Sequence, residues 1–276
     1  MVLAVSASVV LRAEDDAGPA VGAFSSVNDG RYQVLAQSGH QMAYEVNMFM
    51  NEMLRQYETY FNNDAFKSGA RVVVFDNLLD FRRYAASALG TPHPWLAGYC
   101  QPKTDAAGNR SFELVVYQSP SLWSTLAHEG LHQFLDYELG RKIPVWLNEG
   151  MAQYFETSFY TGSSFHVGQV NRSKLLMAQI LIHGGKAPPL TQLVQWTPQE
   201  FYNNAEIAYP MSWAFVYYLL KSDHDPTVSL EFNRYLQAVR NGGDNLKTAQ
   251  ETMARDAARW QADFEDYILH LEAQAN

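Results

Sequence analysis

The stretch "STLAHEGLHQFLDYELGRKIPVWLNEGMAQYFE" at residues 124–156 decides which fold we expect for this chain. Its apolar residues recur at helical spacing before and after a break at 140–144, which begins with glycine and ends with proline. Both residue types are typical of helix ends. The stretch therefore predicts two helices, at roughly 120–139 and 145–158, that are joined by a turn and run antiparallel.

The first of these helices carries the motif H-E-x-x-H, from His128 to His132. Residues four apart lie on one face of a helix, so the two imidazoles can bind a single metal ion. Glu129 is turned about 100° from His128, toward the solvent side of that ion, where it can take a proton from water. Glu149, from the second helix, can supply a third ligand. Two histidines, one glutamate and a water molecule form the open site of catalytic zinc, with one Zn²⁺ per chain.

The chain before this stretch predicts an α/β arrangement. Apolar side chains recur either at helical spacing or in short runs bounded by turn residues. The last two strands are separated by turn residues and should form a hairpin. The expected elements are strands at 31–37, 71–77, 95–102 and 111–118 and helices at 40–61 and 78–89.

After residue 164 the strand patterns end, and helical patterns follow one another. We expect an α+β protein with a small mixed N-terminal sheet and its helices, a two-helix metal-binding core, and an all-helical C-terminal part. The expected divisions are a signal-like or linker segment at 1–30, a catalytic part at 31–160, and a helical part at 161–276 that closes the cleft. The expected C-terminal helices are 171–183, 190–195, 198–204, 209–222, 226–241, 244–254 and 256–273.

Composition narrows the classes of function. The 276 residues are 47% hydrophobic and 18% charged, which is typical of a globular protein with a sizeable core. The net charge of −9 argues against nucleic acid as a partner, because nucleic-acid binding needs a basic surface. Cys100 is the single cysteine, which excludes an internal disulfide and a cysteine-rich metal site.

The N-terminus suggests a compartment. An apolar run at 2–11 is followed by acidic residues, like the tail of a secretory signal, although the positively charged start of such a signal is missing. We expect export to the cell envelope or periplasm, with the cytoplasm as the alternative. No segment approaches the 18 apolar residues of a transmembrane helix, so we expect no stable membrane span. The oligomeric state is left open.

The segments "HEGLHQF" and "WLNEGMAQYFE" resemble the gluzincin metallopeptidases, which combine H-E-x-x-H with a distant glutamate. Over about residues 30–270 the chain resembles most a bacterial family of peptidase-MA-like domains of unknown function. That family pairs the motif with P-x-W-L-N-E-G-x-A-x-Y-F, as residues 144–155 do here.

The resemblance implies a zincin-like core around the two helices. It also implies zinc ligands at His128, His132 and Glu149, and hydrolysis of a peptide or protein substrate by zinc-activated water. Glu129 would act as general base and then protonate the leaving amine.

A further group must stabilise the oxyanion that forms during such a reaction. Tyr209, which we expect to open the apolar helix "YPMSWAFVYYLL", lies about where aminopeptidase-like gluzincins carry their transition-state tyrosine. Packing at a helix start is the alternative for Tyr209, and His166 and His183 are alternative donors. Because the glutamate-bearing strand with which aminopeptidases capture a free amine has no counterpart, we leave endo- and exo-cleavage open.

The sequence also bears on which residues orient the metal ligands, on where a peptide binds, and on two rival functions. Gln153 stands where several gluzincins carry an acidic residue. Asp136 or Asn148 could orient a ligand histidine instead, and an ordinary helix-surface role is the alternative for Asp136. A peptide could add a strand to the sheet edge, at hairpin strand 95–102 or 111–118. The rivals are a non-catalytic zinc-binding scaffold for a peptide or envelope partner, and a zinc hydrolase of non-peptide amides such as cell-wall fragments.

Overall fold

The computed structural model describes the chain in eight segments and confirms an α+β fold. The chain divides into two compact units, Met1–Phe134 and Leu135–Asn276. The limits expected from the sequence, 1–30, 31–160 and 161–276, remain predictions. The described segments are 24–61, 70–90, 96–104, 110–138, 143–161, 164–222, 225–242 and 244–272.

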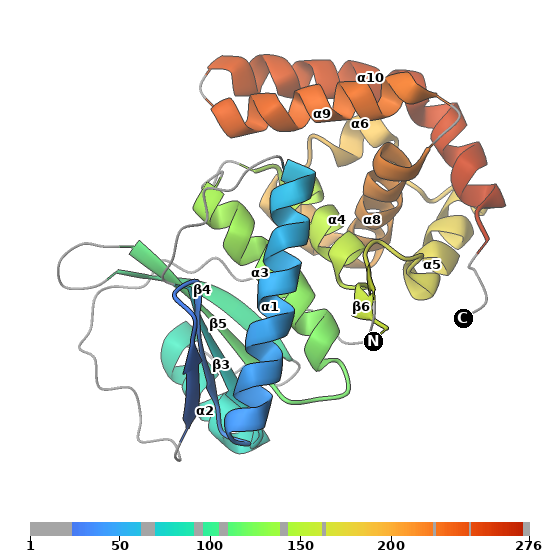
Figure 1. Cartoon of the computed structure of the whole chain (residues 1–276). Helices are drawn as coiled ribbons and strands as arrows, with labels where there is room; N and C mark the ends of the chain where they lie inside the picture. Colours follow the sequence, from blue (N-terminus) through green and yellow to red (C-terminus); the bar gives the residue numbers. More distant parts are fainter. Residues whose placement is uncertain are drawn as a thin grey trace. The chain divides into compact units, whose positions relative to one another are not determined.

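The first unit contains a mixed five-stranded sheet in the order β1-β2-β3-β5-β4 (Figure 1). The three inner strands run parallel, and each edge strand is antiparallel to its neighbour. The expected hairpin is confirmed by the antiparallel pairing of β4 with β5. The strands are β1 (Ser25–Asn28), β2 (Tyr32–Ala36), β3 (Ala70–Phe75), β4 (Gly98–Thr104) and β5 (Arg110–Tyr117).

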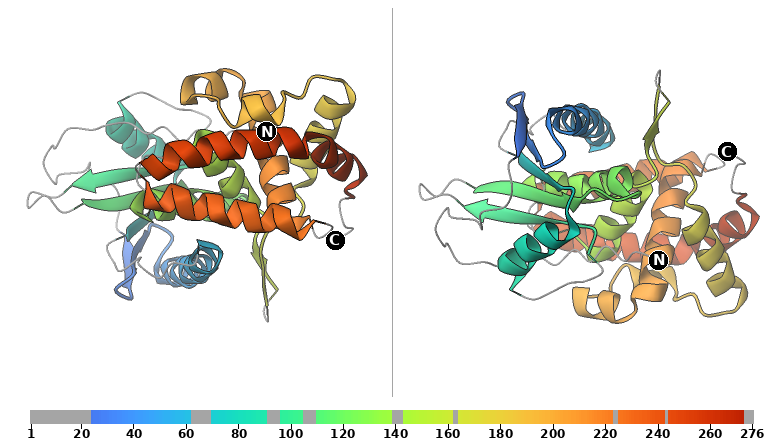
Figure 2. Two further views of the ribbon diagram at one scale, coloured as in Figure 1. Left: turned by 90° about the horizontal axis from the view of Figure 1, so that it is seen from above. Right: turned by 90° about the horizontal axis from the view of Figure 1, so that it is seen from below.

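Both faces of this sheet are covered, because β3 is apolar on both sides. Helix α1 (His40–Phe61) and helix α2 (Leu78–Leu89) lie on opposite faces, as Figures 1 and 2 show. On the α2 side, Val73 and Phe75 of β3 belong to a buried cluster with Phe81 of α2. The bounds of both helices agree with those expected from the sequence.

The second unit is formed by helices around α8, which packs against α4, α5, α9 and α10. The residues of α8 from Ala208 to Leu219 are all buried, as its continuous apolar run requires. Figure 2 shows α9 and α10 side by side. The helices are α4 (Val145–Phe155), α5 (Arg172–His183), α6 (Leu190–Leu193), α7 (Pro198–Asn203), α8 (Ala205–Lys221), α9 (Pro226–Asn241) and α10 (Asp244–His270).

Helix α3 (Leu122–Glu138) links the two units through the chain, because the division at 134 falls inside it. In the part of the chain that the structure describes, no helix is both long enough and apolar enough to cross a membrane.

Four details differ from the sequence-based expectations. Strand β1 lies inside the expected linker. Its polar sequence SSVN has no strand pattern, and the strand forms by pairing with β2. A short ladder of β6 (Phe159–Tyr160) and β7 (Phe165–His166) occurs where no strand was expected. Helix α10 is continuous instead of two helices, because no glycine or proline interrupts it. Helix α8 begins at Ala205 and not at 209, so Tyr209 does not open it, and Pro210 lies inside the helix.

Candidate metal centre

Helix α3 presents the two histidines of the H-E-x-x-H motif one turn apart. The ring centroids of His128 and His132 are 4.8 Å from each other, with the ring planes at 79°. Only 3% of His128 and 7% of His132 is exposed. Polar side chains are seldom buried to this degree unless they bind a partner, so the pair is unlike an ordinary solvated helix face.

Contacts within the first unit hold α3 where the histidines project. The Tyr57 hydroxyl of α1 donates a hydrogen bond of 2.6 Å to the backbone carbonyl of Ala127. Gly130, between the histidines, allows close packing, because a Cβ there would lie 2.9 Å from Met50 Cε. Strand β4 starts against the same helix, since a Cβ on Gly98 would lie 2.7 Å from Thr125 Cγ2. The apolar and hydrogen-bonded surroundings therefore fix the register of α3.

Helix α4 presents Glu149, whose side chain is fully buried. The next residue, Gly150, lies against the backbone of α8: a Cβ there would be 2.6 Å from the carbonyl oxygen of Ser212. Only glycine permits this distance between the helices. The buried Gln153 donates its side-chain amide to the backbone carbonyl of Glu149 at 3.1 Å. Gln153 thus stabilises the α4 backbone at the position of the carboxylate.

Two further residues of the second unit act on Glu149. The Tyr202 hydroxyl of α7 donates a hydrogen bond of 3.0 Å to Glu149 Oε1. Burial lowers the pKa of Lys174 in α5 below its ordinary value, although the charges of Glu156 and Glu149 act to raise it. Glu149 therefore lies within electrostatic range of an ammonium group and within hydrogen-bond range of a phenol.

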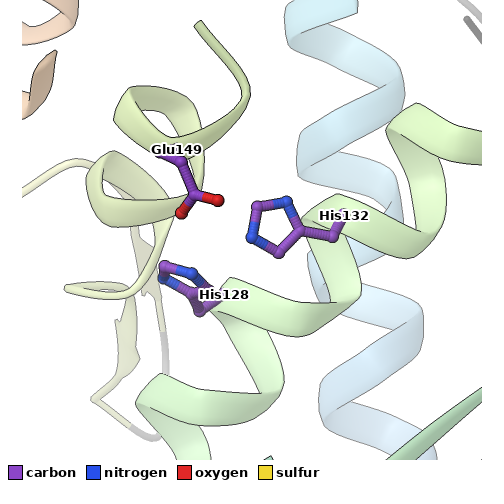
Figure 3. A group of neighbouring side chains, drawn as sticks. All are labelled: His128, His132 and Glu149. Atoms are coloured by element: carbon purple, nitrogen blue, oxygen red, sulfur yellow. The ribbon is translucent and has the colours of Figure 1, made fainter. Parts of the chain in front are cut away.

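His128, His132 and Glu149 form one group that could bind a metal ion. Each residue offers one ligand atom, and these atoms lie within 4.8 Å of one another. Figure 3 shows the two imidazoles of α3 and the carboxylate of α4 pointing toward one another. Ligand atoms of one tetrahedral zinc ion are roughly 3.4 Å apart, and 4.8 Å is the upper limit of the separations here. Two imidazoles and a carboxylate are a fitting donor set for a divalent transition metal.

The other predicted site residues lie as follows. Glu129 is fully buried in α3, including both carboxylate oxygens. Tyr209 lies in the second turn of α8 and is 5% exposed. Its ring meets that of Phe201 edge to face at a centroid distance of 5.3 Å, and the ammonium of Lys174 is 5.4 Å from its centroid. The catalytic roles of Glu129 and Tyr209 stay predictions.

The two alternative oxyanion donors, His166 and His183, lie on different elements, β7 and α5. His166 of β7 stacks on Phe159 with ring centroids 5.0 Å apart. His183 is exposed in the last turn of α5. Asp136 and Asn148, the expected orienting residues, are half-buried in α3 and α4, and their roles stay predictions.

Tyr202 contacts the site but is not among the residues expected from the sequence. The signal available was the capping-box pattern "TPQE" at 197–200, which predicts a short helix containing this tyrosine. No sequence pattern indicates which face of that helix meets α4, because this depends on tertiary packing.

The comparison with protein families gives one match that covers this region. The model of a family described as a protein of unknown function (DUF1570) matches residues 122–239. No curated protein and no solved structure matches the chain. The region that is similar to this family of unknown function runs from α3 into α9 and includes all three residues of the candidate metal centre.

Proposed function

We propose that the chain is a zinc-dependent metallopeptidase of the gluzincin type. The observation that carries this proposal is the buried group of His128, His132 and Glu149, with Glu129 in the same helix as the two histidines. Two histidines and a glutamate leave a fourth coordination position for water or substrate, as catalytic zinc sites do and closed structural sites do not.

Each residue has a distinct role in this proposal. His128, His132 and Glu149 hold the ion. A bound Zn²⁺ would lower the pKa of a water molecule and polarise the substrate carbonyl. Glu129 takes a proton from the water whose oxygen attacks the carbonyl carbon. When the carbon–nitrogen bond breaks, Glu129 delivers that proton to the leaving amine, so that water is divided between the two products.

The sheet supports a peptide as substrate. Among the described strands β4 is terminal in the sheet, while β5 pairs on both sides. Strand β4 begins at Gly98, against Thr125, which precedes His128 by about one helical turn. We expect a substrate strand to pair with β4 at residues 98–101, because Pro102 cannot donate a backbone hydrogen bond.

Two rivals use the same metal centre. A zinc-binding scaffold would hold a peptide without cutting it, and a zinc amidase would cut a non-peptide amide such as a cell-wall fragment. The presence of Glu129 beside His128 favours an enzyme over a scaffold, because a scaffold has no need of a general base.

The test compares wild type with Glu129→Gln after both are loaded with zinc. Metal content is measured by elemental analysis, and cleavage is measured on a diverse peptide library and on muropeptides by mass spectrometry. We expect about one zinc per chain in both proteins and peptide cleavage by wild type alone. His128→Ala, His132→Ala and Glu149→Ala should each lose the metal.

Other outcomes separate the rivals. Zinc binding at unit stoichiometry without cleavage of either substrate class favours the scaffold. Cleavage of muropeptides alone favours the amidase. Equal cleavage by wild type and Glu129→Gln would refute the assigned base.

A further inference from the structure

The hydrogen bond from Tyr202 to Glu149 Oε1 reaches a carboxylate that the metal proposal already uses. A phenol that donates 3.0 Å to one oxygen restricts rotation of the whole carboxylate group. The second oxygen, Oε2, is buried. A carboxylate held in this way can offer one oxygen to an ion while the other remains hydrogen-bonded to protein.

Helix α7 is built to keep Tyr202 in place despite its short length. Thr197 and Glu200 form a reciprocal capping box: the Thr197 backbone N–H donates to Glu200 Oε2 at 2.8 Å, and the Glu200 N–H donates to Thr197 Oγ1 at 3.3 Å. Glu200 Oε2 also accepts a hydrogen bond from the Thr197 hydroxyl at 2.8 Å, and the bonds from the Thr197 N–H and hydroxyl lower the pKa of Glu200. At the other end, the Asn204 amide donates to the Glu200 carbonyl at 2.8 Å. Both ends of α7 are therefore fixed.

The neighbour of Tyr202 anchors the helix in the core. Phe201 is fully buried and meets the rings of Tyr202 and Tyr209 edge to face, at centroid distances of 5.5 Å and 5.3 Å. Helix α7 packs on both α4 and α8. Packing of α7 thus sets the position of the Tyr202 hydroxyl, which donates to Glu149.

We propose that Tyr202 is a positioning residue for the metal centre: its hydroxyl holds Glu149 through Oε1, so that Oε2 is the oxygen that binds the ion. This inference rests on the proposed metal site and does not require that the site cut peptides. It assigns a role to a residue that no motif of the sequence indicates. A hydrogen bond from a neutral phenol also limits the negative charge that Glu149 donates, which helps a bound ion to remain a strong Lewis acid.

The experiment measures zinc affinity by competition with a chromogenic chelator, for wild type, Tyr202→Phe and Tyr267→Phe. Tyr267 is the matched control, since it is also half-buried in the second unit and its hydroxyl donates to a backbone carbonyl, that of Lys221, at 3.3 Å. We expect Tyr202→Phe to weaken zinc binding by about 10- to 100-fold, the range for loss of a group that orients a metal ligand. Tyr267→Phe should leave the affinity within about threefold of wild type.

Cobalt substitution gives a readout that depends on ligand geometry. The visible absorption of Co²⁺-loaded Tyr202→Phe should differ from that of wild type, while Tyr267→Phe should match it. Wild-type affinity and an unchanged spectrum in Tyr202→Phe would overturn the inference, as would failure of wild type to bind any zinc. Metal binding with the expected loss in Tyr202→Phe but no peptide cleavage would support the inference while contradicting the proposed peptidase.

Discussion

Substitution of Gly150 by alanine tests whether the close packing of α4 on α8 sets the position of Glu149. A Cβ at this residue would lie 2.6 Å from Ser212 O, 3.0 Å from Ser212 C and 2.7 Å from Val216 Cγ2. Ordinary van der Waals contact begins at 3.4 Å, so the approach to the carbonyl oxygen is too short by about 0.8 Å. The obstacle is backbone and cannot rotate away. Helix α4 must therefore move away from α8 and carry Glu149 with it.

The magnitude follows from two opposing effects. Overpacking against a rigid neighbour costs about 3 kcal/mol, the upper end of the usual range. Alanine recovers about 1 kcal/mol through its better helix propensity. We expect the free energy of unfolding of Gly150→Ala to fall by roughly 2 kcal/mol. Because the shift also moves a metal ligand, zinc affinity should fall as well.

Gly130→Ala is the matched control, since it makes the same change in the other helix that carries metal ligands. There the nearest atoms are Met50 Cε at 2.9 Å and Tyr57 Oη at 3.2 Å. The end of a methionine side chain can change rotamer at low cost. The cost of repacking should therefore nearly cancel the helix-propensity gain of about 1 kcal/mol, and Gly130→Ala should stay close to wild type in stability.

Urea unfolding of the metal-free proteins measures stability, and chelator competition measures zinc affinity. The reasoning is refuted if Gly150→Ala is as stable as wild type, or if Gly130→Ala is the more damaging of the two. It is also refuted if Gly150→Ala loses stability but binds zinc as tightly as wild type, because the shift of α4 would then not reach Glu149.

Three further predictions concern single side chains. Glu113→Gln should lower the free energy of unfolding by about 1–3 kcal/mol, because the fully buried carboxylate forms an ion pair of 2.9 Å with Lys103. Lys103 is partly exposed, which keeps the loss below that expected for a fully buried ion pair. Tyr57→Phe should cost about 1 kcal/mol in urea unfolding, since it removes the hydroxyl that donates to the α3 backbone. Tyr209→Phe should lower kcat on a cleaved peptide with unchanged zinc content; normal turnover would remove Tyr209 from the oxyanion role.

The parts of the fold that the sequence predicts well are those with strong local signals. The bounds of α1 and α2 were predicted from helical spacing, and α2 has explicit end signals: Asn77 caps its start, and Gly90 ends it with φ +73°. The parts that failed have none. Strand β1 is recognisable only through its partner β2, and the sheet order places β5 inside and β4 outside by pairings that no local pattern encodes.

The candidate site divides in the same way. The spacing of His128 and His132 follows from the helical period, so α3 alone decides that both lie on one face. The pairing of that face with Glu149 was expected from a helix–turn–helix path and from the resemblance, and the three ligand atoms do lie close together. Tyr202 was missed because its contact with Glu149 depends on how α7 packs on α4.

The glycines of the two motifs show why the spacing of the histidines and the glutamate is by itself a weak predictor of a metal centre. In "HEGLH" and "LNEGMA" the glycines bind nothing, yet Gly130 lies against Met50 and Gly150 against the backbone at Ser212. A chain with the same histidines and glutamate but a larger residue at 150 would keep every ligand and lose the helix distance that positions one of them. A search for this kind of centre should therefore require the glycine after the distant glutamate as strictly as the glutamate itself.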